Sequence, residues 1–265
     1  MAYFVAELIN DDDKINDNEN DNDNHLPDGY TSRSLVNVIV NVNVKNAVFI
    51  MQVSLFNGFA DKNPKPITIR EVVEIIRADQ RLQVLTENHR RYRAMGDTAR
   101  ADAEKQHMPC YSVAVLFSGG KQQKHIVSYT GLSIVDLDHI PAERMSEVLA
   151  LVRGDEHTLL AYTTLSGHGV RVLARYALNT SNDNDNVNDN CLPDGKSTST
   201  LTSTFSNYKQ AFLTVNTYYQ NLTGLPTDGQ CKNVGRISTI AYDEELYYNP
   251  EATSFIIEPE EKKSV

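Results

Sequence analysis

The sequence predicts an α+β fold, because segments with the two-residue period of β-strands alternate with segments that repeat apolar residues at helical spacing. The strand-like runs lie at residues 111–117, 125–130, 132–138, 158–164 and 170–176. The helix-like patterns lie at residues 67–106, 142–152 and 205–222. With 265 residues, the chain is long enough to bury the core of one catalytic-sized domain.

Two segments carry the acidic charge of the chain, whose formal net charge is −10. Residues 11–30 hold eight acids and one lysine, and residues 182–196 hold four acids and one lysine, so the two segments carry −7 and −3. The remainder is therefore neutral. A strongly acidic protein is a poor partner for phosphate backbones, but a neutral domain is not excluded as one.

The same two segments share a repeated peptide, with N-D-N-D-N-H-L-P-D-G in the first and N-V-N-D-N-C-L-P-D-G in the second. Asn and Asp bury too little apolar area to offset the entropy of ordering the chain, so both segments are predicted to be disordered insertions. We expect an N-terminal segment at residues 1–33 and one domain at residues 34–257. The second insertion, residues 180–204, interrupts this domain, and a charged tail follows at residues 258–265.

Calcium binding is the alternative interpretation of these segments, because alternating Asp and Asn supply oxygen ligands. An EF-hand loop beginning at Asp17 would need glycine at its sixth position and glutamate at its twelfth. Asn22 and Asp28 stand at those positions. The mismatch disfavours calcium.

Cysteine spacing and hydropathy restrict the class of protein. Cys110, Cys191 and Cys231 form no C-x-x-C pair, so neither a zinc knuckle nor a disulfide framework is predicted. The first ten residues do not resemble a signal peptide, and no apolar run reaches 18 residues. We expect a cytoplasmic protein with reduced thiols and no membrane contact.

The first part of the predicted domain combines strands with a basic helical region. Residues 34–56 alternate valine with asparagine before they become continuously apolar, which predicts one or two strands. Thr68 and Glu71 form a capping box at the start of the next helical pattern. Its continuation interleaves Tyr92 with four arginines and is either a solvated helix face or a contact surface for phosphates. The arginines are Arg90, Arg91, Arg93 and Arg100.

The elements that follow are delimited by glycine and proline. The turn at Gly119 and Gly120 joins two strands into a hairpin. Pro141 begins a helix that ends before Gly154, and Gly224 caps the helix at residues 205–222. The segment R-I-S-T-I-A-Y-D, residues 236–243, reads as a last strand.

Two carboxylates stand at the end of the strand-like run L-S-I-V-D-L-D. In a strand, residues i and i+2 point to the same face, so Asp136 and Asp138 project together. Two adjacent carboxylates repel unless a cation lies between them, and oxygen ligands suit Mg²⁺ or Mn²⁺. The same pattern also occurs in ordinary turns at strand ends.

A small-residue turn follows the next strand. Glycines on both sides of His168 allow a tight turn whose N–H groups could hold a phosphate, with Ser166 in the same turn and Arg171 just beyond it. A surface turn with an exposed histidine is the alternative.

The order of these motifs resembles the archaeo-eukaryotic primase (primase-polymerase) superfamily: strand with D-x-D, helix, strand, S-x-H turn, strand, and a later acid. The segment D-G-Q-C-K-N-V-G-R-I-S-T-I-A-Y-D-E-E-L-Y-Y-N-P, the L-F-N-G-F opening and the K-Q-H-M-P-C element are similar to the VirE N-terminal-domain branch of bacterial mobile-element proteins. The resemblance covers residues 52–255. That branch often precedes a helicase-like region.

The resemblance implies an RRM-like mixed sheet with flanking helices that uses Mg²⁺ or Mn²⁺, nucleoside triphosphates and a single-stranded DNA template. Asp136 and Asp138 match the first metal-binding motif, and His168 matches the nucleotide-contacting histidine. The third acid is either Asp228 or Asp243, and the arginine that follows Asp228 favours it. The nucleotide-binding residues are then Ser166, His168, Arg171 and Arg236.

The expected function is that of a metal-dependent nucleotidyltransferase in the replication of a mobile element, with a helicase as a partner. A catalytically inactive module that binds single-stranded nucleic acid is the main alternative. A rolling-circle nuclease with Tyr218-Tyr219 or Tyr247-Tyr248 as nucleophile would need a histidine-apolar-histidine metal motif, which the sequence lacks.

Overall fold

The computed structural model describes residues 51–179 and 198–259, all within one compact unit, Ile50–Val265. Its strands are β1 (Gln52–Phe56), β2 (Lys65–Thr68), β3 (Cys110–Ser112), β4 (Val115–Phe117), β5 (Ile126–Tyr129), β6 (Leu132–Leu137), β7 (Thr158–Thr163), β8 (Val170–Leu178), β9 (Ser238–Thr239), β10 (Tyr247–Tyr248) and β11 (Phe255–Ile257). The helices are α2 (Ile69–Ala78), α3 (Gln80–Ala94), α4 (Thr98–Gln106), α5 (Met145–Arg153) and α6 (Thr198–Thr223), and short 3₁₀ turns are η1 (Gln123–His125), η2 (Ala142–Arg144) and η3 (Gly229–Lys232). The predicted α+β fold class is confirmed.

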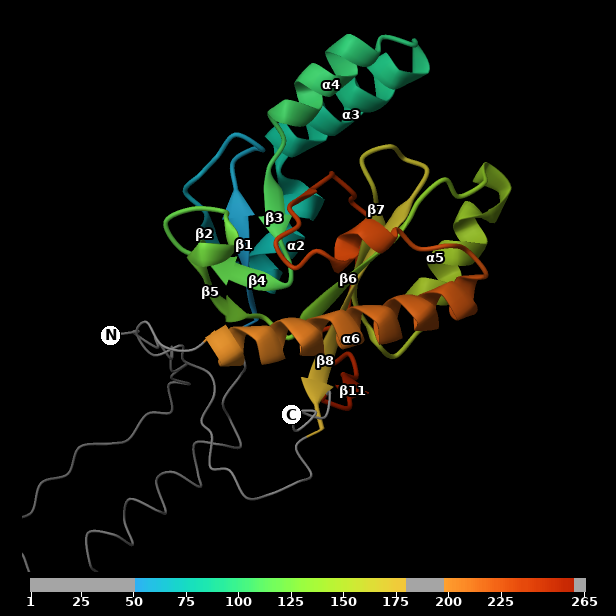
Figure 1. Ribbon diagram of the computed structural model, residues 1–265. Helices are drawn as coiled ribbons and strands as arrows, with labels where there is room; N and C mark the ends of the chain where they lie inside the picture. Colours follow the sequence, from blue (N-terminus) through green and yellow to red (C-terminus); the bar gives the residue numbers. More distant parts are fainter. Residues whose placement is uncertain (1–50, 180–197, 260–265) are drawn as a thin grey trace, which may run out of the picture. The chain divides into compact units, whose positions relative to one another are not determined.

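The main sheet is an RRM-like unit. Strands β6 and β7 both pair with β8 in antiparallel fashion, so β6 and β7 run parallel with β8 between them, and α5 connects the two. Helix α6 follows β8 and lies across the sheet (Figure 1). The order β-α-β-β-α is that of a split β-α-β fold. Strand β10 extends the sheet beside β7, and β11 pairs in parallel with the end of β8.

A second, four-stranded sheet has the order β2-β1-β3-β9 and is antiparallel throughout. Helix α2 packs on this part of the molecule through four apolar side chains at helical spacing, which are Ile69, Val72, Val73 and Ile76. The predicted capping box of Thr68 and Glu71 begins this helix. Strands β4 and β5 form the predicted hairpin as a separate two-stranded ribbon, but the first residues of the strand expected at 111–117 belong to β3 of the second sheet.

Alternation along β6 divides the core in two. Leu132 and Ile134 face a cluster shared with β1, β3 and α2, whereas Val135 and Leu137 face a cluster shared with α5 and α6. The period of two therefore places every second residue of β6 between the two sheets. Asp136 lies on the same face as Ile134.

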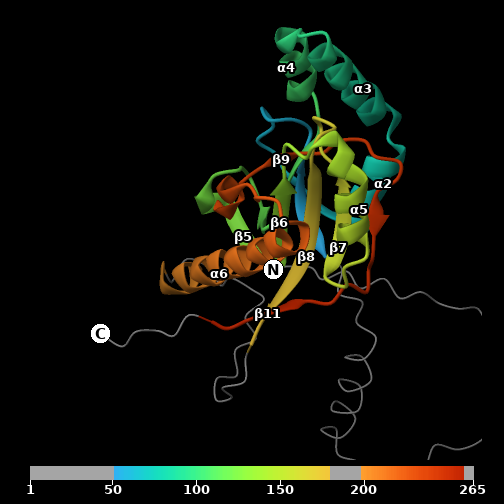
Figure 2. The same ribbon diagram turned by 90° about the vertical axis from the view of Figure 1, so that its right-hand side faces the viewer.

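Helices α3 and α4 pack on each other and project from the sheets (Figures 1 and 2). They bury few side chains, namely Leu82, Thr86 and His89 of α3 and Ala101 of α4. The sequence predicted helix at residues 67–106, and the structure divides it into three.

The other expectations have mixed outcomes. Helices were expected at residues 142–152 and 205–222, where η2 with α5 and then α6 are found. Only two residues of the predicted last strand, Ser238 and Thr239, pair as β9, and β11 was not predicted. Residues 198–204 of the predicted insertion at residues 180–204 are helical and form the start of α6, so the predicted end of this insertion is wrong. The first predicted insertion, residues 180–197 of the second, the calcium alternative at Asp17, the strand-like residues 34–50 and residues 260–265 of the tail lie outside the described residues. Within the described parts of the chain, no helix is long and apolar enough to cross a membrane.

Candidate metal and nucleotide site

Asp136 is a buried carboxylate in the middle of the molecule, 3% exposed, on the face of β6 that points between the two sheets. Its cross-strand neighbour in the register of β6 and β8 is Arg171. The guanidinium holds both carboxylate oxygens, with Nε 2.5 Å from Oδ1 and Nη2 2.8 Å from Oδ2. Burial by itself would raise the pKa of Asp136, but the charge and hydrogen bonds of Arg171 outweigh burial and lower this pKa.

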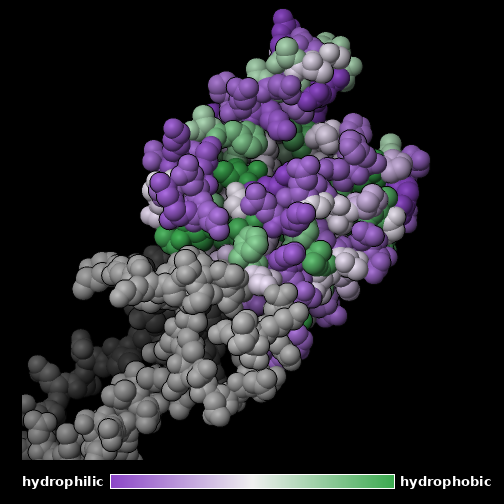
Figure 3. Space-filling model, in the orientation of Figure 1, coloured by the Kyte–Doolittle hydropathy of each residue, from purple (hydrophilic) through white to green (hydrophobic). Residues whose placement is uncertain are grey.

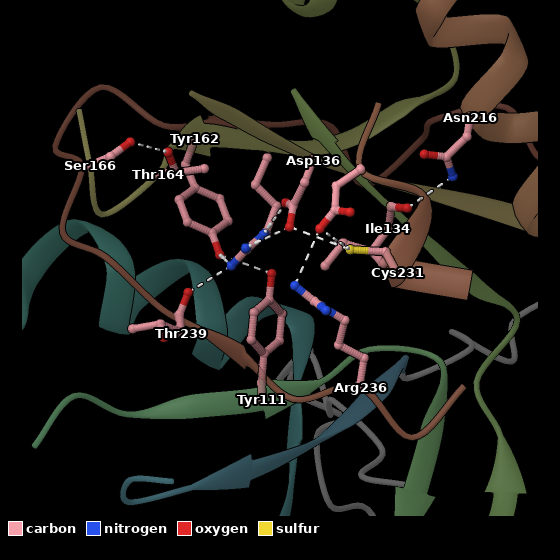
Figure 4. Close-up of polar contacts among 12 residues, drawn as sticks. Tyr111, Ile134, Asp136, Tyr162, Thr164, Ser166, Asn216, Cys231, Arg236 and Thr239 are labelled. Atoms are coloured by element: carbon pink, nitrogen blue, oxygen red, sulfur yellow. Dashed lines mark hydrogen bonds and ion pairs between the residues drawn. The ribbon is translucent and has the colours of Figure 1, made fainter. Parts of the chain in front are cut away.

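Arg171 is itself enclosed by acceptors, and its side chain is 11% exposed. Its Nη1 donates to the carbonyl oxygen of Thr239 at 2.7 Å and to the hydroxyl of Tyr162 at 3.3 Å. The Tyr162 hydroxyl also meets that of Tyr111 at 2.9 Å (Figure 4). All three guanidinium nitrogens therefore face protein acceptors. Arg171 holds Asp136, and its predicted contact with a nucleotide stays a prediction that these contacts do not support.

Asp228 joins this group from η3. Its backbone N–H donates to the carbonyl oxygen of Asp136 at 2.9 Å, which fixes the two acids side by side. The thiol of Cys231 lies between them, with Sγ 3.5 Å from Oδ2 of Asp136 and 4.0 Å from Oδ2 of Asp228. Burial, followed by the charge of Asp136, raises the pKa of Cys231 to about 12, so the thiol is protonated at neutral pH and donates.

Arg236 lies on the solvent side of this group. Its Nη2 is 3.3 Å from Oδ2 of Asp228, and its Nη1 is 3.4 Å from the side-chain oxygen of Gln230. The side chain is 36% exposed, so unlike Arg171 it has surface open to a ligand. Its position near phosphate, which the sequence predicted, is compatible with this geometry.

Asp138 follows the end of β6 and is exposed, whereas Asp228 is half-buried and Asp136 buried. Its pKa is raised, first by desolvation and next by the charge of Asp136, with a further contribution from Asp228. The three acids therefore act on one another electrostatically, as two carboxylates sharing a site do. Asp138 lies one residue beyond β6, so the expectation that Asp136 and Asp138 project together stays a prediction.

The S-G-H turn lies directly against the end of β6. The N–H of Ile140 donates to the carbonyl oxygen of His168 at 2.8 Å. At Gly169, a Cβ atom would lie 2.7 Å from the carbonyl oxygen of Leu137 and 2.9 Å from Oδ1 of Asp138, so only glycine allows this approach. Ser166 and His168 are exposed at the tip of the turn, next to Asp138.

The backbone N–H groups of this turn are used within it. Gly167, with φ of +75°, donates to the carbonyl oxygen of Thr164 at 3.0 Å, and the His168 N–H donates to Oγ of Ser166 at 3.2 Å. These two amides already have acceptors, so the expectation that backbone N–H groups of this turn hold a phosphate stays a prediction that these two contacts do not support. The side chains of Ser166 and His168 are the groups left for a phosphate to meet.

Arg90 of α3 supports the turn from behind and was not predicted as part of the site. Its Nη2 donates to the carbonyl oxygen of Thr164 at 3.1 Å, and its Nε donates to that of Leu165 at 3.3 Å. Arginine in a basic helical stretch gives no indication of such a long-range contact. Cys231 was likewise missed, because a lone cysteine without a partner motif carries no signal.

Asp243, the other candidate for the third acid, lies elsewhere in the hydrogen-bond network. Its carboxylate accepts from the N–H of Thr163 at 2.7 Å and from that of Glu245 at 3.0 Å. It secures the segment after β9 against β7. The structure thus groups Asp228, and not Asp243, with Asp136.

Two of the three clustered side chains suit a hard divalent cation. Ligand atoms of Asp136, Asp228 and Cys231 lie within 4.8 Å of one another. Carboxylate oxygens suit Mg²⁺ or Mn²⁺, whereas a protonated thiol does not. Arg171 already holds both oxygens of Asp136, and Asp138, which is exposed, does not belong to this group of ligand atoms.

Comparison with known proteins gives one match. Residues 103–248 match the family model described as BT4734-like, N-terminal domain, and this span contains every acid of the site. No curated protein and no solved structure matches the chain. Because the match covers more than half of the 265 residues, the chain belongs to the BT4734-like N-terminal domain family.

Proposed function

We propose that the chain is a metal-dependent nucleotidyltransferase domain of primase-polymerase type that acts in the DNA replication of a mobile element. The observation that supports this most is the contact between two motifs distant in sequence. The end of β6 with Asp138, which is coupled electrostatically to Asp136 and Asp228, lies against the S-G-H turn through the bond from Ile140 to His168 and the close approach at Gly169. A carboxylate cluster beside an exposed Ser and His is the arrangement that a metal-bound triphosphate needs.

Each group has a distinct part in this proposal. Asp138 and Asp228, with Asp136 behind them, would hold Mg²⁺ or Mn²⁺, which lowers the pKa of an attacking hydroxyl and neutralises a leaving pyrophosphate. His168 and Ser166 would donate hydrogen bonds to triphosphate oxygens, and Arg236 would offset phosphate charge. Arg171 keeps Asp136 ionised and correctly oriented.

The mobile-element context, the single-stranded DNA template and a helicase partner rest on the resemblance to the primase-polymerase superfamily. The neutral charge of the chain outside its two acidic segments is compatible with a template. Basic residues near the site, Arg90 and Arg236, supply local positive charge.

A template-directed synthesis assay tests the proposal, with labelled nucleotides, a single-stranded DNA template and Mg²⁺ or Mn²⁺. Asp138→Asn is the sharpest variant, because this carboxylate is exposed, whereas a change at the buried Asp136 also threatens folding. Loss of one such group is expected to lower the rate on the order of 100-fold or more. Glu74→Gln, an exposed acid on α2, is the matched control. Synthesis that persists at the same rate in Asp138→Asn contradicts the proposal.

A catalytically inactive module that binds single-stranded nucleic acid is the second candidate. One observation favours it: Arg171 already occupies both oxygens of Asp136, as a permanent internal cation would in a site that has no metal. This candidate predicts nucleic-acid binding that does not depend on divalent cations and no synthesis by the wild type. Synthesis that Asp138→Asn abolishes would rule it out.

A further inference from the structure

The α3–α4 hairpin, residues 80–106, is a basic projection on a chain that is acidic as a whole. It carries six Lys and Arg against four Asp and Glu, which leaves +2, while the whole chain has −10. The face of the hairpin in view is largely hydrophilic (Figure 3). Residues 80–102 also lie outside the span that matches the family model. The family match therefore gives no account of residues 80–102 or of their charge.

The tip of the hairpin gathers two guanidinium groups around one aromatic ring. The Cζ atoms of Arg91 and Arg100 lie 5.2 and 5.7 Å from the centroid of the Tyr92 ring. Both arginines are exposed, and Tyr92 is half-buried. Aromatic rings and guanidinium planes are the surfaces on which unpaired bases stack, and guanidinium groups also bind phosphates.

The contacts of Arg91 and Arg100 within the hairpin leave both guanidinium groups accessible. Arg100 lies 3.5 Å from Asp97, with 71% of its side chain exposed, and Arg91 donates to the neutral side chain of Asn88 at 2.9 Å. Exposed ion pairs contribute little free energy, so a phosphate can compete for Arg100 at low cost.

The side chain of Arg90, in the C-terminal half of α3, reaches the proposed nucleotide site. Arg90 donates to the carbonyl oxygens of Thr164 and Leu165, and its Nε would lie 3.5 Å from a Cβ at Gly167. Arg90 and Arg91 are adjacent in sequence. A strand bound at Arg91 and Tyr92 would therefore be held one residue along α3 from the arginine that contacts the S-G-H turn.

We propose that the Arg91–Tyr92–Arg100 surface binds single-stranded nucleic acid, with phosphates at the two guanidinium groups and a base on the tyrosine ring. The role of this strand as a template rests on the proposed function, but its binding does not. The hairpin holds the strand at the rim of the site, and Arg90 connects the hairpin to the turn.

Fluorescence anisotropy with a labelled oligothymidine tests the binding in the full chain. Arg91→Gln with Arg100→Gln is expected to weaken binding about 10-fold at low salt and to reduce the slope of log K against log salt by about 1.4, or about 0.7 for each lost phosphate contact. Tyr92→Ala is expected to weaken binding at least about 5-fold, and Tyr92→Phe to retain it, because the ring supplies the stacking.

Lys124→Gln with Lys209→Gln is the control, because it removes the same charge from two other exposed positions, on η1 and α6. Equal affinity and equal salt slope for the arginine variant and this control would overturn the proposal. Competition by polyglutamate as strong as that by unlabelled oligonucleotide would also overturn it, since the surface would then be a general site for acidic chains. Far-UV circular dichroism checks that each variant is folded.

The outcomes separate this inference from the proposed function. If Asp138→Asn binds the oligonucleotide normally and lacks synthesis while the arginine variant binds normally, the inference fails and the function stands. If the wild type lacks synthesis and the arginine variant loses binding, the surface is established and the nucleotidyltransferase proposal fails.

Discussion

The buried pair of Asp136 and Arg171 predicts a large coupling in folding stability. Replacing Arg171 by methionine keeps much of the volume but leaves the carboxylate of Asp136 buried without its cation, which costs about 3–5 kcal/mol. The carbonyl oxygen of Thr239 also loses a donor, which adds about 1–3 kcal/mol. Asp136→Asn leaves the guanidinium uncompensated and is expected to cost about 3–5 kcal/mol as well.

The double variant, Asp136→Asn with Arg171→Met, removes both charges at once. It should be about as destabilised as Arg171→Met alone, so the coupling energy should have about the magnitude of the cost of Asp136→Asn, 3–5 kcal/mol. Urea unfolding followed by circular dichroism at neutral pH measures all four free energies. Additive single effects, with a coupling energy below about 0.5 kcal/mol, would refute the view that the pair acts as one buried unit.

Three further predictions follow from the same contacts. Gly169→Ala should lower the free energy of unfolding in urea by about 1–3 kcal/mol, because its Cβ would meet the main-chain oxygen of Leu137. Gly229→Ala, where a Cβ meets open space among the described residues, should lower it less. Equal losses would contradict the close approach at Gly169. Because the pKa of Asp136 is lowered, its contribution to stability is present at neutral pH and is lost as the pH falls below about 4. The difference in free energy of unfolding between wild type and Asp136→Asn should therefore shrink on acidification. A constant difference would argue against the pair. Burial raises the pKa of Cys110 to about 11 and that of Cys231 to about 12. Iodoacetamide should therefore label both thiols only after unfolding, which peptide mass spectrometry can show. Labelling of either thiol in the native protein at pH 8 would contradict their burial.

Much of the fold followed from local pattern. The run L-S-I-V-D-L-D predicted strand β6, and the apolar residues of α2 with its capping box predicted that helix and its start. Short strands were harder, because β9 has two residues and β11 three, and their pairing depends on distant partners. A two-residue strand has no period to detect.

The candidate site was predictable as a set of residues, but its interior was not. The D-x-D strand, the S-G-H turn and the arginine after Asp228 indicated the groups that the structure brings together. The bidentate hold of Arg171 on Asp136, the position of Cys231 and the support from Arg90 all arise from contacts between residues 35 to 95 positions apart. Local sequence contains no signal for such contacts.

Metal-dependent nucleotide binding tests the central claim most directly. The dissociation constant of a labelled nucleoside triphosphate would be measured with and without Mn²⁺ for the wild type, Asp138→Asn and the control Glu74→Gln. The proposed site predicts that Mn²⁺ lowers the dissociation constant for the wild type and for the control. In Asp138→Asn, the Mn²⁺-dependent gain in affinity should be at least about 10-fold smaller. An equal Mn²⁺ effect in Asp138→Asn, or no effect of Mn²⁺ on the wild type, would contradict it.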